Sequence, residues 1–239
     1  MRLACVVWAV LICVRSLYGF FGARSNSFYC KQVAASVTAT GRGMLMHVIS
    51  IAHRYASFLL KDGSFIHCYL PRKPTREEGG GPIEWFSFTP TGECVPRECG
   101  PDPSQVKHQT AHSVVYGDTD SVFVKLDLTG EDFPLDSVTE RLDSHNPTKE
   151  YFNPLCYEAI LLCEHMCKSV NRFFKAVCGE SSTIDLSYEK LWLRLCLQDK
   201  KKYSGLRCDE ILDRKTGALQ YPYQKQVSEG DARVKYVPC

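Results

Sequence analysis

The sequence predicts an α+β protein in which an antiparallel sheet carries helices packed on one face. Two β-branched and aromatic runs, 113–115 and 122–124, flank a short polar segment, a pattern typical of a β-hairpin. A long helix is expected between Asn153 and Gly179, because Asn and the Pro after it suit a helix start and Gly suits a helix end. Residues 184–197 alternate between apolar and polar side chains, which indicates a strand.

Two helices are expected, one after Asn153 and one within residues 28–60, and each carries an apolar stripe that would pack on the sheet. In the helix after Asn153 the stripe recurs in steps of three and four residues: Leu155, Ala159, Leu162, Met166, Val170, Phe173 and Val177. Residues 28–60 are also expected to be helical, with a stripe of Val33, Val37, Met44, Val48, Ile51 and Tyr55. Core packing is therefore the expected main role of both helices.

Three other segments carry weaker signals. Residues 61–109 are rich in Pro and contain a run of three Gly, which predicts a loop with a short hairpin near 85–88. The alternation of the later strand slips at Glu189 and Lys190, which predicts a bend or tight turn there. Residues 1–14 look like a signal peptide and are too short to span a bilayer as a helix; we favour a truncated or wrongly joined end.

Composition limits the classes of function. At 239 residues the chain is long enough for one domain with its own core. Its 29 basic and 27 acidic residues give a net charge of +2, so any contact with nucleic acid must come from local clusters. Thirteen cysteines at irregular spacing indicate reduced thiols in an intracellular protein, with Cys163 and Cys167 packed on a helix, rather than a disulfide framework.

The segment between the hairpin arms, Tyr116-Gly117-Asp118-Thr119-Asp120-Ser121, carries the sharpest chemical signal. Its two carboxylates stand one residue apart, and their repulsion is costly unless a cation holds them together. Mg²⁺ prefers such oxygen ligands, and paired metal ions serve in-line phosphoryl displacement. Asp is also an ordinary turn residue, and a structural turn is the commoner use of such a pair.

The hexapeptide resembles motif C in the palm domain of family B DNA polymerases. The resemblance implies a partial polymerase palm in which Asp118 and Asp120 are the catalytic carboxylates. It also implies two Mg²⁺ ions, with Asp120 a ligand of both ions and Asp118 beside them. Glu189 would be a third, accessory metal ligand by the same resemblance, although a plain surface Glu is an equally good interpretation.

Two earlier stretches are similar to the same family. Residues 15–22 resemble the end of motif B, on the helix that leaves the fingers, which implies that Tyr18 and Gly19 bind the nucleotide. Leu11 stands where the family's phosphate-binding Lys should be, so this match is incomplete. Residues 32–45 resemble the palm helix that follows motif B.

A later stretch, Lys200-Lys201-Lys202-Tyr203, resembles the Lys-Lys-x-Tyr motif of these polymerases. The resemblance implies that Lys200, Lys201 and Tyr203 bind the primer–template duplex. Lysines in a compact run can lie along a phosphate backbone, and a neighbouring ring can pack against sugar or base edges. A triple lysine on its own would indicate only a solvated surface.

The resemblance also divides the chain into units. These are the end of the fingers helix with an unmatched apolar N-terminus, the palm helix region, an inserted loop, the palm with catalytic hairpin, helix and Lys-Lys-x-Tyr strand, and the start of the palm-to-thumb connection: 1–22, 23–63, 64–112, 113–206 and 207–239. Several viral members, herpesvirus polymerases among them, are similar in carrying an insertion before motif C. A viral, herpesvirus-like parent protein is therefore expected.

The function implied is template-directed nucleotidyl transfer by a two-metal mechanism in a longer DNA-directed DNA polymerase. Expected partners are primer–template DNA, deoxynucleoside triphosphates, the rest of the polymerase and a processivity factor; no membrane is expected, and the location is the nucleus, the host's for a viral protein. Motif A, which supplies the other essential metal Asp, has no match, so the chain alone is expected to be inactive. Two alternatives stay open: a DNA-binding remnant without chemistry, and a secreted cysteine-containing protein with a chance hexapeptide.

Overall fold

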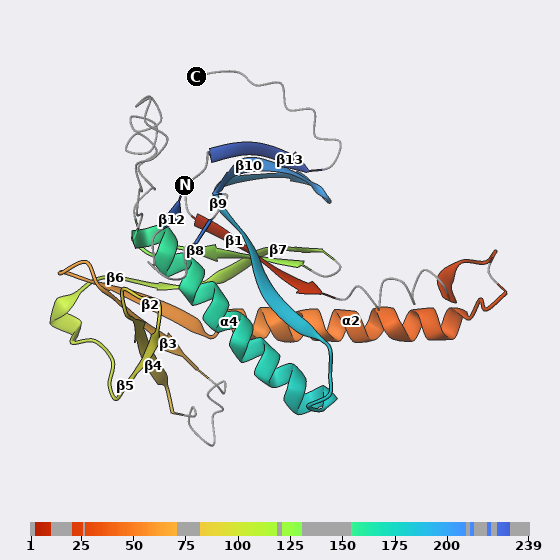
Figure 1. Ribbon diagram of the computed structural model, residues 1–239, viewed down its shortest axis with the longest axis horizontal. Coiled ribbons are helices and arrows are strands. Elements are labelled where there is room, and N and C mark those ends of the chain that lie inside the picture. The colour runs from red at the N-terminus through yellow and green to blue at the C-terminus, as the bar shows by residue number, and fades with distance from the viewer. Residues whose placement is uncertain are drawn as a thin grey trace.

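The described part of the computed structural model contains two large antiparallel sheets, a separate two-stranded sheet and two long helices (Figure 1). It describes residues 3–10, 21–25, 27–70, 82–118, 121–130, 154–208, 211–212, 219–220 and 224–229. One helix covers a face of the larger sheet and also reaches the smaller sheet. This arrangement confirms the expected α+β class.

The larger sheet has six strands among the described residues. In spatial order they are β13 (Gln224–Glu229), β10 (Lys202–Cys208), β9 (Asp185–Asp199), β1 (Leu3–Val10), β8 (Ser121–Leu126) and β7 (Ser113–Asp118). Two short strands, β11 (Ile211–Leu212) and β12 (Leu219–Gln220), pair separately. The adjacent β7 and β8 confirm the hairpin expected around the acidic pair.

Strand β1 lies inside the larger sheet, between the acidic hairpin and β9. It pairs antiparallel with both neighbours, so Val7 lies opposite Val122 on one side and Tyr188 on the other. The sequence analysis expected no strand in this apolar N-terminal stretch. A short apolar run does not by itself predict a strand, and the pairing along both edges shows that residues 3–10 form one.

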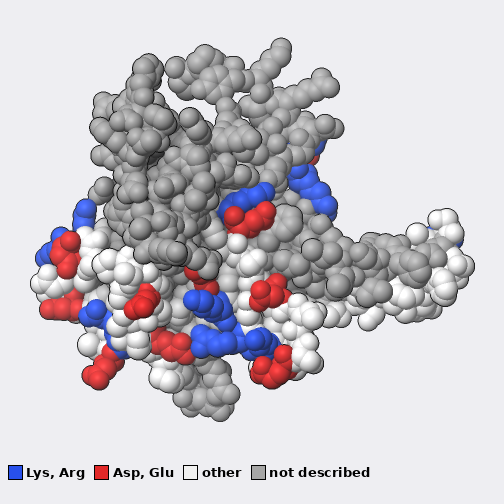
Figure 2. Space-filling model, viewed as in Figure 1, with Lys and Arg blue, Asp and Glu red and all other residues white. Residues whose placement is uncertain are grey.

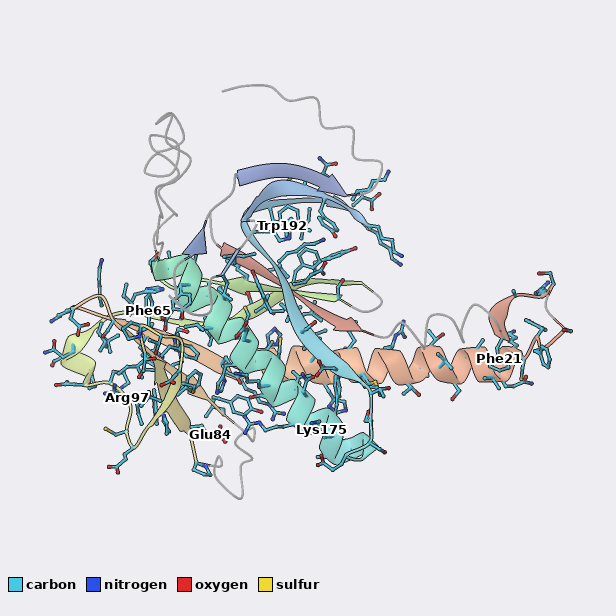
Figure 3. The ribbon with its side chains drawn as sticks, viewed as in Figure 1. Phe21, Phe65, Glu84, Arg97, Lys175 and Trp192 are labelled. Carbon is cyan, nitrogen blue, oxygen red and sulfur yellow. The ribbon has the colours of Figure 1, made fainter. Side chains whose placement is uncertain are left out.

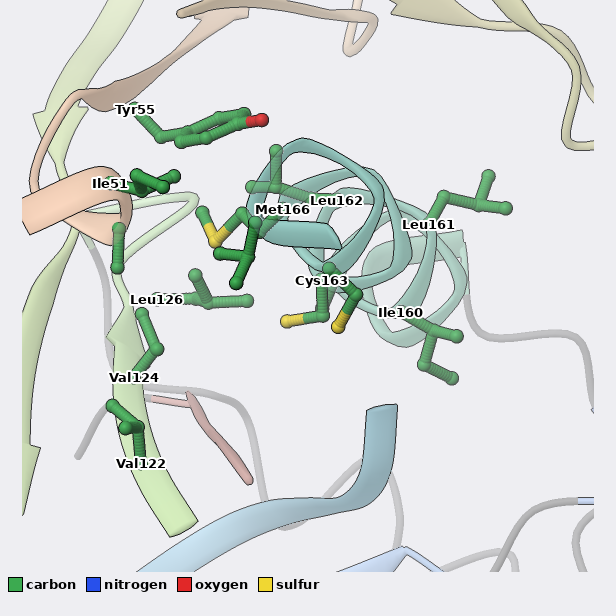
Figure 4. Close-up of a cluster of buried hydrophobic side chains, with 14 of the residues drawn as sticks. Ile51, Tyr55, Val122, Val124, Leu126, Ile160, Leu161, Leu162, Cys163 and Met166 are labelled. Atoms are coloured by element: carbon green, nitrogen blue, oxygen red, sulfur yellow. The ribbon is translucent and has the colours of Figure 1, made fainter. Parts of the chain in front are cut away.

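Helix α4 (Pro154–Cys178) confirms the helix predicted after Asn153. Gly179 ends it with a φ of 91° and donates its N–H to the carbonyl of Lys175 at 2.9 Å. The predicted stripe is mostly buried, with Leu162 0% exposed, but Val177 in the last turn is 64% exposed. The core that it forms with the larger sheet (Figure 4) includes Cys163, Cys167, Met166, Val122, Val124 and Leu126, so the predicted packing of both cysteines is confirmed.

Helix α2 (Lys31–Ala52) is shorter than predicted. It ends at Ala52, and the chain enters strand β2 (Tyr55–Leu60), so the expectation of helix to residue 60 is wrong there. The reason is tertiary: β2 pairs with a strand on each side, and this pairing overrides a weak local preference. The first half of α2 extends away from both sheets in Figure 1, and Val33, predicted on its packing face, is 40% exposed.

The smaller sheet occupies most of the segment predicted to be an inserted loop. Its spatial order is β5 (Cys94–Arg97), β4 (Glu84–Phe88), β3 (Phe65–Tyr69), β2 and β6 (Val106–Ala111), with a 3₁₀ turn, Pro103–Gln105, leading into β6. The loop assignment for 64–112 is therefore wrong for the described residues, while the hairpin expected near 85–88 is confirmed as β4 and β5. Among these residues the prolines lie between strands, except Pro96, which lies in the edge strand β5.

A buried polar network ties the smaller sheet to α4. Ser57 Oγ lies 2.7 Å from both His67 Nδ1 and His112 Nε2, and His67 Nε2 lies 2.7 Å from Glu158 Oε1 on α4. The hydroxyl of Tyr55, on β2, donates to the Oγ of Ser169, further along α4, at 2.7 Å. A buried polar group left without a partner costs on the order of 1–3 kcal/mol, so these bonds fix the helix against the sheet.

Candidate active site

The acidic hairpin consists of β7 and β8 joined by two residues. Asp118 is the last residue of β7 and lies opposite Ser121, the first residue of β8. The side chain of Asp118, together with Thr119 and Asp120, lies outside the described part of the chain. The structure therefore fixes the two strands that carry the acidic turn, and the roles of Asp118 and Asp120 stay predictions.

A bulge-like register shift shapes the strand that leads to the turn. The pairing of β7 with β8 shifts between Val114 and Tyr116, so Val115 is an extra residue. The backbone N–H of Val114 donates to His53 Nε2, just beyond α2, at 3.1 Å. This bond links the end of α2 to the strand that carries the acidic pair.

The predicted DNA-binding lysines form the turn between β9 and β10. Asp199 lies opposite Lys202, so Lys200 and Lys201 make a two-residue turn, and all three lysines are exposed. The N–H of Lys200 donates to Asp199 Oδ1 at 2.7 Å. Lys201 has a φ of 61°, in the left-handed region that residues with a Cβ seldom adopt.

Strand β9 bends back over the larger sheet and carries this turn toward the acidic hairpin (Figure 1). Trp192 pairs with Ala4, at the end of β1 away from the acidic turn. The seven residues that follow Trp192 in β9 would take a straight strand roughly 23 Å beyond that end. Instead, the backbone N–H of Lys201 donates to Tyr116 Oη at 2.9 Å, across a sequence separation of 85 residues. The acidic strand and the lysine turn are thus in direct contact.

An aromatic cluster fills the space under the folded-back hairpin. Val122 and Val124, the two neighbours of Phe123 in β8, belong to the hydrophobic core between the larger sheet and α4. The side chain of Phe123 therefore occupies the opposite face of the sheet. Its ring centroid is 5.3 Å from that of Tyr116 and 5.1 Å from that of Tyr203, and the Tyr203 ring centroid is 6.0 Å from that of Trp192. Figure 3 labels Trp192 in this part of the larger sheet. Phe123 and Trp192 are 1% and 0% exposed, so the ring of Tyr203 packs against buried aromatic side chains. The contact of Tyr203 with DNA stays a prediction.

Glu189 lies on β9, two strands away from β8. Tyr188 and Leu191 both pack on the helix-side core, so Glu189 and Lys190 together take the place of one residue on the other face. The slip in alternation is thus a register shift within a continuous strand, so of the two predicted alternatives, a bend or a tight turn, the tight turn is wrong. Glu189 Oε1 lies 3.4 Å from Lys190 Nζ, and two strand spacings put its backbone roughly 10 Å from β8.

Acidic and basic side chains are interspersed on the described surface in Figure 2, in keeping with the small net charge. Within that described part, no group of three or more His, Cys, Asp or Glu side chains is placed to hold a metal ion. That finding does not cover Asp118 and Asp120, whose carboxylate oxygens are the donors that Mg²⁺ prefers. The predicted nucleotide contacts Tyr18 and Gly19 also lie outside the described residues.

Sequence analysis missed one constellation, the chain of bonds through Ser57, His67 and Glu158. These contacts have the order of a nucleophile, a base and an acid. Ser57 and His67 are 0% exposed, however, so no substrate reaches the hydroxyl, and the network is structural. The partners lie 10 and 91 residues apart along the chain, a pattern that no local motif reveals.

Comparison with known proteins identifies the family of this chain. The sequence model of DNA polymerase family B matches residues 8–159, more than half of the chain. The chain belongs to DNA polymerase family B. The match includes the acidic hairpin, so the hexapeptide is part of a family-wide resemblance and not a chance match.

Several curated relatives are viral polymerases. DNA polymerase beta of African swine fever virus, isolate Tick/Malawi/Lil 20-1/1983, is 30% identical over 99 residues, 40% of this chain and 8% of that protein. The protein of the same name from isolate Pig/Portugal/Lis 60/1960 is 29% identical over 99 residues with the same coverage. DNA polymerase of Phaeocystis pouchetii virus is 31% identical over 123 residues, 50% of this chain and 8% of that protein. The chain thus spans about 8% of the length of these polymerases.

Membership of this family indicates the general class of function. Family B DNA polymerases are nucleotidyltransferases that act on DNA and nucleotides and generally use divalent metal ions. The similar viral polymerases support a viral family B protein, and a specifically herpesvirus-like character stays a prediction. None of the helices among the described residues is long and apolar enough to cross a membrane.

Proposed function

We propose that this chain is part of the palm of a family B DNA polymerase, where it joins a metal-binding hairpin to a grip on the primer–template duplex. The observation that supports this function best is the bond between Lys201 N–H and Tyr116 Oη. It brings the exposed lysine turn to the strand that ends at Asp118. Template-directed nucleotidyl transfer needs both features at one place, since the metal site must meet the primer end.

In this proposal Asp118 and Asp120 hold two Mg²⁺ ions, with Asp120 a ligand of both. When bound, the ions would lower the pKa of the primer 3′-hydroxyl and stabilise the departing pyrophosphate. Glu189 is the accessory carboxylate. Its Oε1 lies 3.4 Å from Lys190 Nζ, and this ion pair orients the carboxylate on the face opposite α4.

The lysine turn supplies the duplex contact. Lys200 and Lys201 are exposed on a two-residue turn, a position from which their ammonium groups would reach backbone phosphates. Tyr203, held by the aromatic cluster, packs against a sugar or base edge at its outer side. Tyr18 and Gly19 contact the incoming nucleotide.

The proposal extends to the parent protein. The partners are primer–template DNA, deoxynucleoside triphosphates, the remainder of the polymerase and a processivity factor, in the nucleus of the host of a herpesvirus-like virus. Because the sequence has no match to motif A, the chain alone lacks an essential metal carboxylate and is inactive without the remainder.

Binding of the chain to a fluorescently labelled primer–template duplex tests this function. We expect a salt-dependent affinity that Lys201→Ala weakens, with a fall of about 1 in the slope of log K against log salt. Lys31→Ala, at an exposed lysine at the start of α2, is the matched control and should leave the slope unchanged. Equal effects of both substitutions, or no binding by the wild type, would refute the duplex contact.

The role of the carboxylates needs a second measurement. We expect Mg²⁺ to strengthen duplex binding by the wild type and not by Asp120→Ala, and we expect no primer extension by the chain alone. Robust extension would overturn the inactivity claim.

A second candidate, a DNA-binding remnant without chemistry, is favoured by the completeness of the lysine turn beside the missing motif A. It predicts duplex binding that is indifferent to Mg²⁺ and to Asp120→Ala. The same measurements therefore separate the two functions.

A further inference from the structure

We infer that Tyr116 is the positioning residue for the lysine turn: its hydroxyl sets where Lys200 and Lys201 stand relative to the acidic hairpin. The consequence for DNA rests on the proposed function, but the local contact does not. The evidence is the bond from the Lys201 N–H to Tyr116 Oη at 2.9 Å.

The turn requires outside support because its backbone is strained. Lys201 adopts a φ of 61°, which Gly tolerates and Lys does not favour. The first amide of the turn, at Lys200, is bonded by the neighbouring Asp199 at 2.7 Å. The second amide, at Lys201, is bonded by a side chain from β7, on the far side of β8 and β1. One half of the turn is therefore held locally, and the other half is held by the acidic hairpin.

The hydroxyl of Tyr116 is a rigid support. Its ring stands edge-on to Phe123 at 5.3 Å and 75°, and Phe123 is 1% exposed. Tyr116 also pairs with Phe123 across the strands, so backbone and ring are fixed together. The ring lies two residues before Asp118, so a shift of either hairpin would break the bond. Tyr116 thus acts on the duplex contact through Lys201.

Tyr116→Phe is the decisive substitution, because it keeps the ring contacts and removes only the acceptor oxygen. Single-amide hydrogen exchange by NMR gives the first readout. We expect the Lys201 amide to exchange about fivefold faster in this variant, the order expected for one lost hydrogen bond. Tyr29→Phe, at an exposed tyrosine just before α2, is the matched control and should leave that amide unchanged.

Duplex binding by the same variants gives the second readout. We expect Tyr116→Phe to raise the Kd about two- to fivefold with an unchanged salt slope, since every lysine remains. Lys201→Ala, by contrast, should lower the slope. A purely structural role would alter the unfolding midpoint and leave both readouts at their wild-type values once the chain is folded.

The outcomes distinguish this inference from the proposed function. Unchanged exchange at Lys201, or faster exchange with an unchanged Kd, overturns the positioning role while wild-type binding still supports the duplex contact. Failure of the wild type to bind overturns the proposed function, and with it the DNA consequence of Tyr116. Faster exchange together with a weaker Kd and an unchanged salt slope supports the inference.

Discussion

Mild acid should destabilise this chain through two histidines. His112 lies at the buried end of the Ser57 network, where burial, followed by the nearby His67, lowers its pKa from 6.5 to about 3. His165 on α4 stacks on Phe86 with ring centroids 4.1 Å apart, and burial is the main cause that lowers its pKa from 6.5 to about 4. Both rings therefore stay neutral in the folded chain at pH values where the unfolded chain binds protons.

The sign and size follow from proton linkage. A folded-state pKa below the unfolded value gives stability that is complete above pH 6.5 and is lost as the pH falls toward the folded-state pKa. At pH 5, about 1.5 pH units below 6.5, one such group costs about 2 kcal/mol. We expect the whole of this from His112 and about half from His165, whose partial exposure screens it. The sum of about 3 kcal/mol is a large part of the roughly 5–15 kcal/mol that stabilises a typical domain.

Urea unfolding followed by circular dichroism at pH 5, 6 and 7 measures this loss. His112→Gln is the informative variant, because the Gln amide offers both a donor and an acceptor to Ser57 Oγ and does not titrate. We expect the wild type to lose about 3 kcal/mol between pH 7 and pH 5, and the variant about 1 kcal/mol. His47→Gln, at an exposed position on α2, should keep the wild-type loss. A wild-type pH dependence in His112→Gln would refute the reasoning.

Three further predictions use the same unfolding measurement at pH 7. Leu162→Ala should cost about 2–5 kcal/mol because the side chain is 0% exposed, and Val177→Ala less than about 0.5 kcal/mol because it is 64% exposed; similar losses would contradict the packing of α4. Lys201→Gly should be more stable than Lys201→Ala by about 1 kcal/mol, since a φ of 61° strains any residue with a Cβ, and the reverse order would rule out the left-handed turn. Gly179→Ala should cost about 1 kcal/mol from its φ of 91° alone, because a Cβ there meets no atom within 4 Å; a much larger loss would indicate crowding.

Elements with complete local signals could be predicted from the sequence. Helix α4 has a start residue, an apolar stripe and Gly179 at its end, and its bounds agree with the prediction. The acidic hairpin likewise has two β-branched arms around a polar turn. In both cases the information lies within one segment, so no knowledge of the rest of the fold was needed.

The smaller sheet and β1 could not be predicted, because their signals are not local. The strands of the smaller sheet are only four to six residues long, and prolines lie in several of the connections between them. The Pro-rich composition therefore predicted a loop in place of these short strands. Strand β1 becomes a strand because β8 and β9 offer it two edges. The end of α2 at Ala52 depends in the same way on the pairing of β2.

The candidate site, like the fold, could be predicted from local motifs but not in its long-range contacts. The motifs named the candidate residues Lys200 and Lys201, and the structure brings their turn to the acidic strand. No local pattern indicates that Tyr116 makes the contact, because Tyr116 lies 85 residues from Lys201 and the contact exists only after β9 bends back. The predicted ligands Asp118 and Asp120 stay predictions, as their carboxylates lie outside the described part of the chain.

Apolar packing, rather than charge, determines where the charged groups of this site stand. Exposed pairs of charges contribute at most about 1 kcal/mol, too little to bend a strand back over a sheet. Burial of Phe123 and Trp192, 1% and 0% exposed under the hairpin, supplies several times that amount. The lysine turn therefore keeps its place without DNA or metal, and the bond from Lys201 to Tyr116 adds the final alignment. It follows that a substitution in the aromatic cluster, which removes no carboxylate and no lysine, should weaken duplex binding as much as the loss of a lysine does.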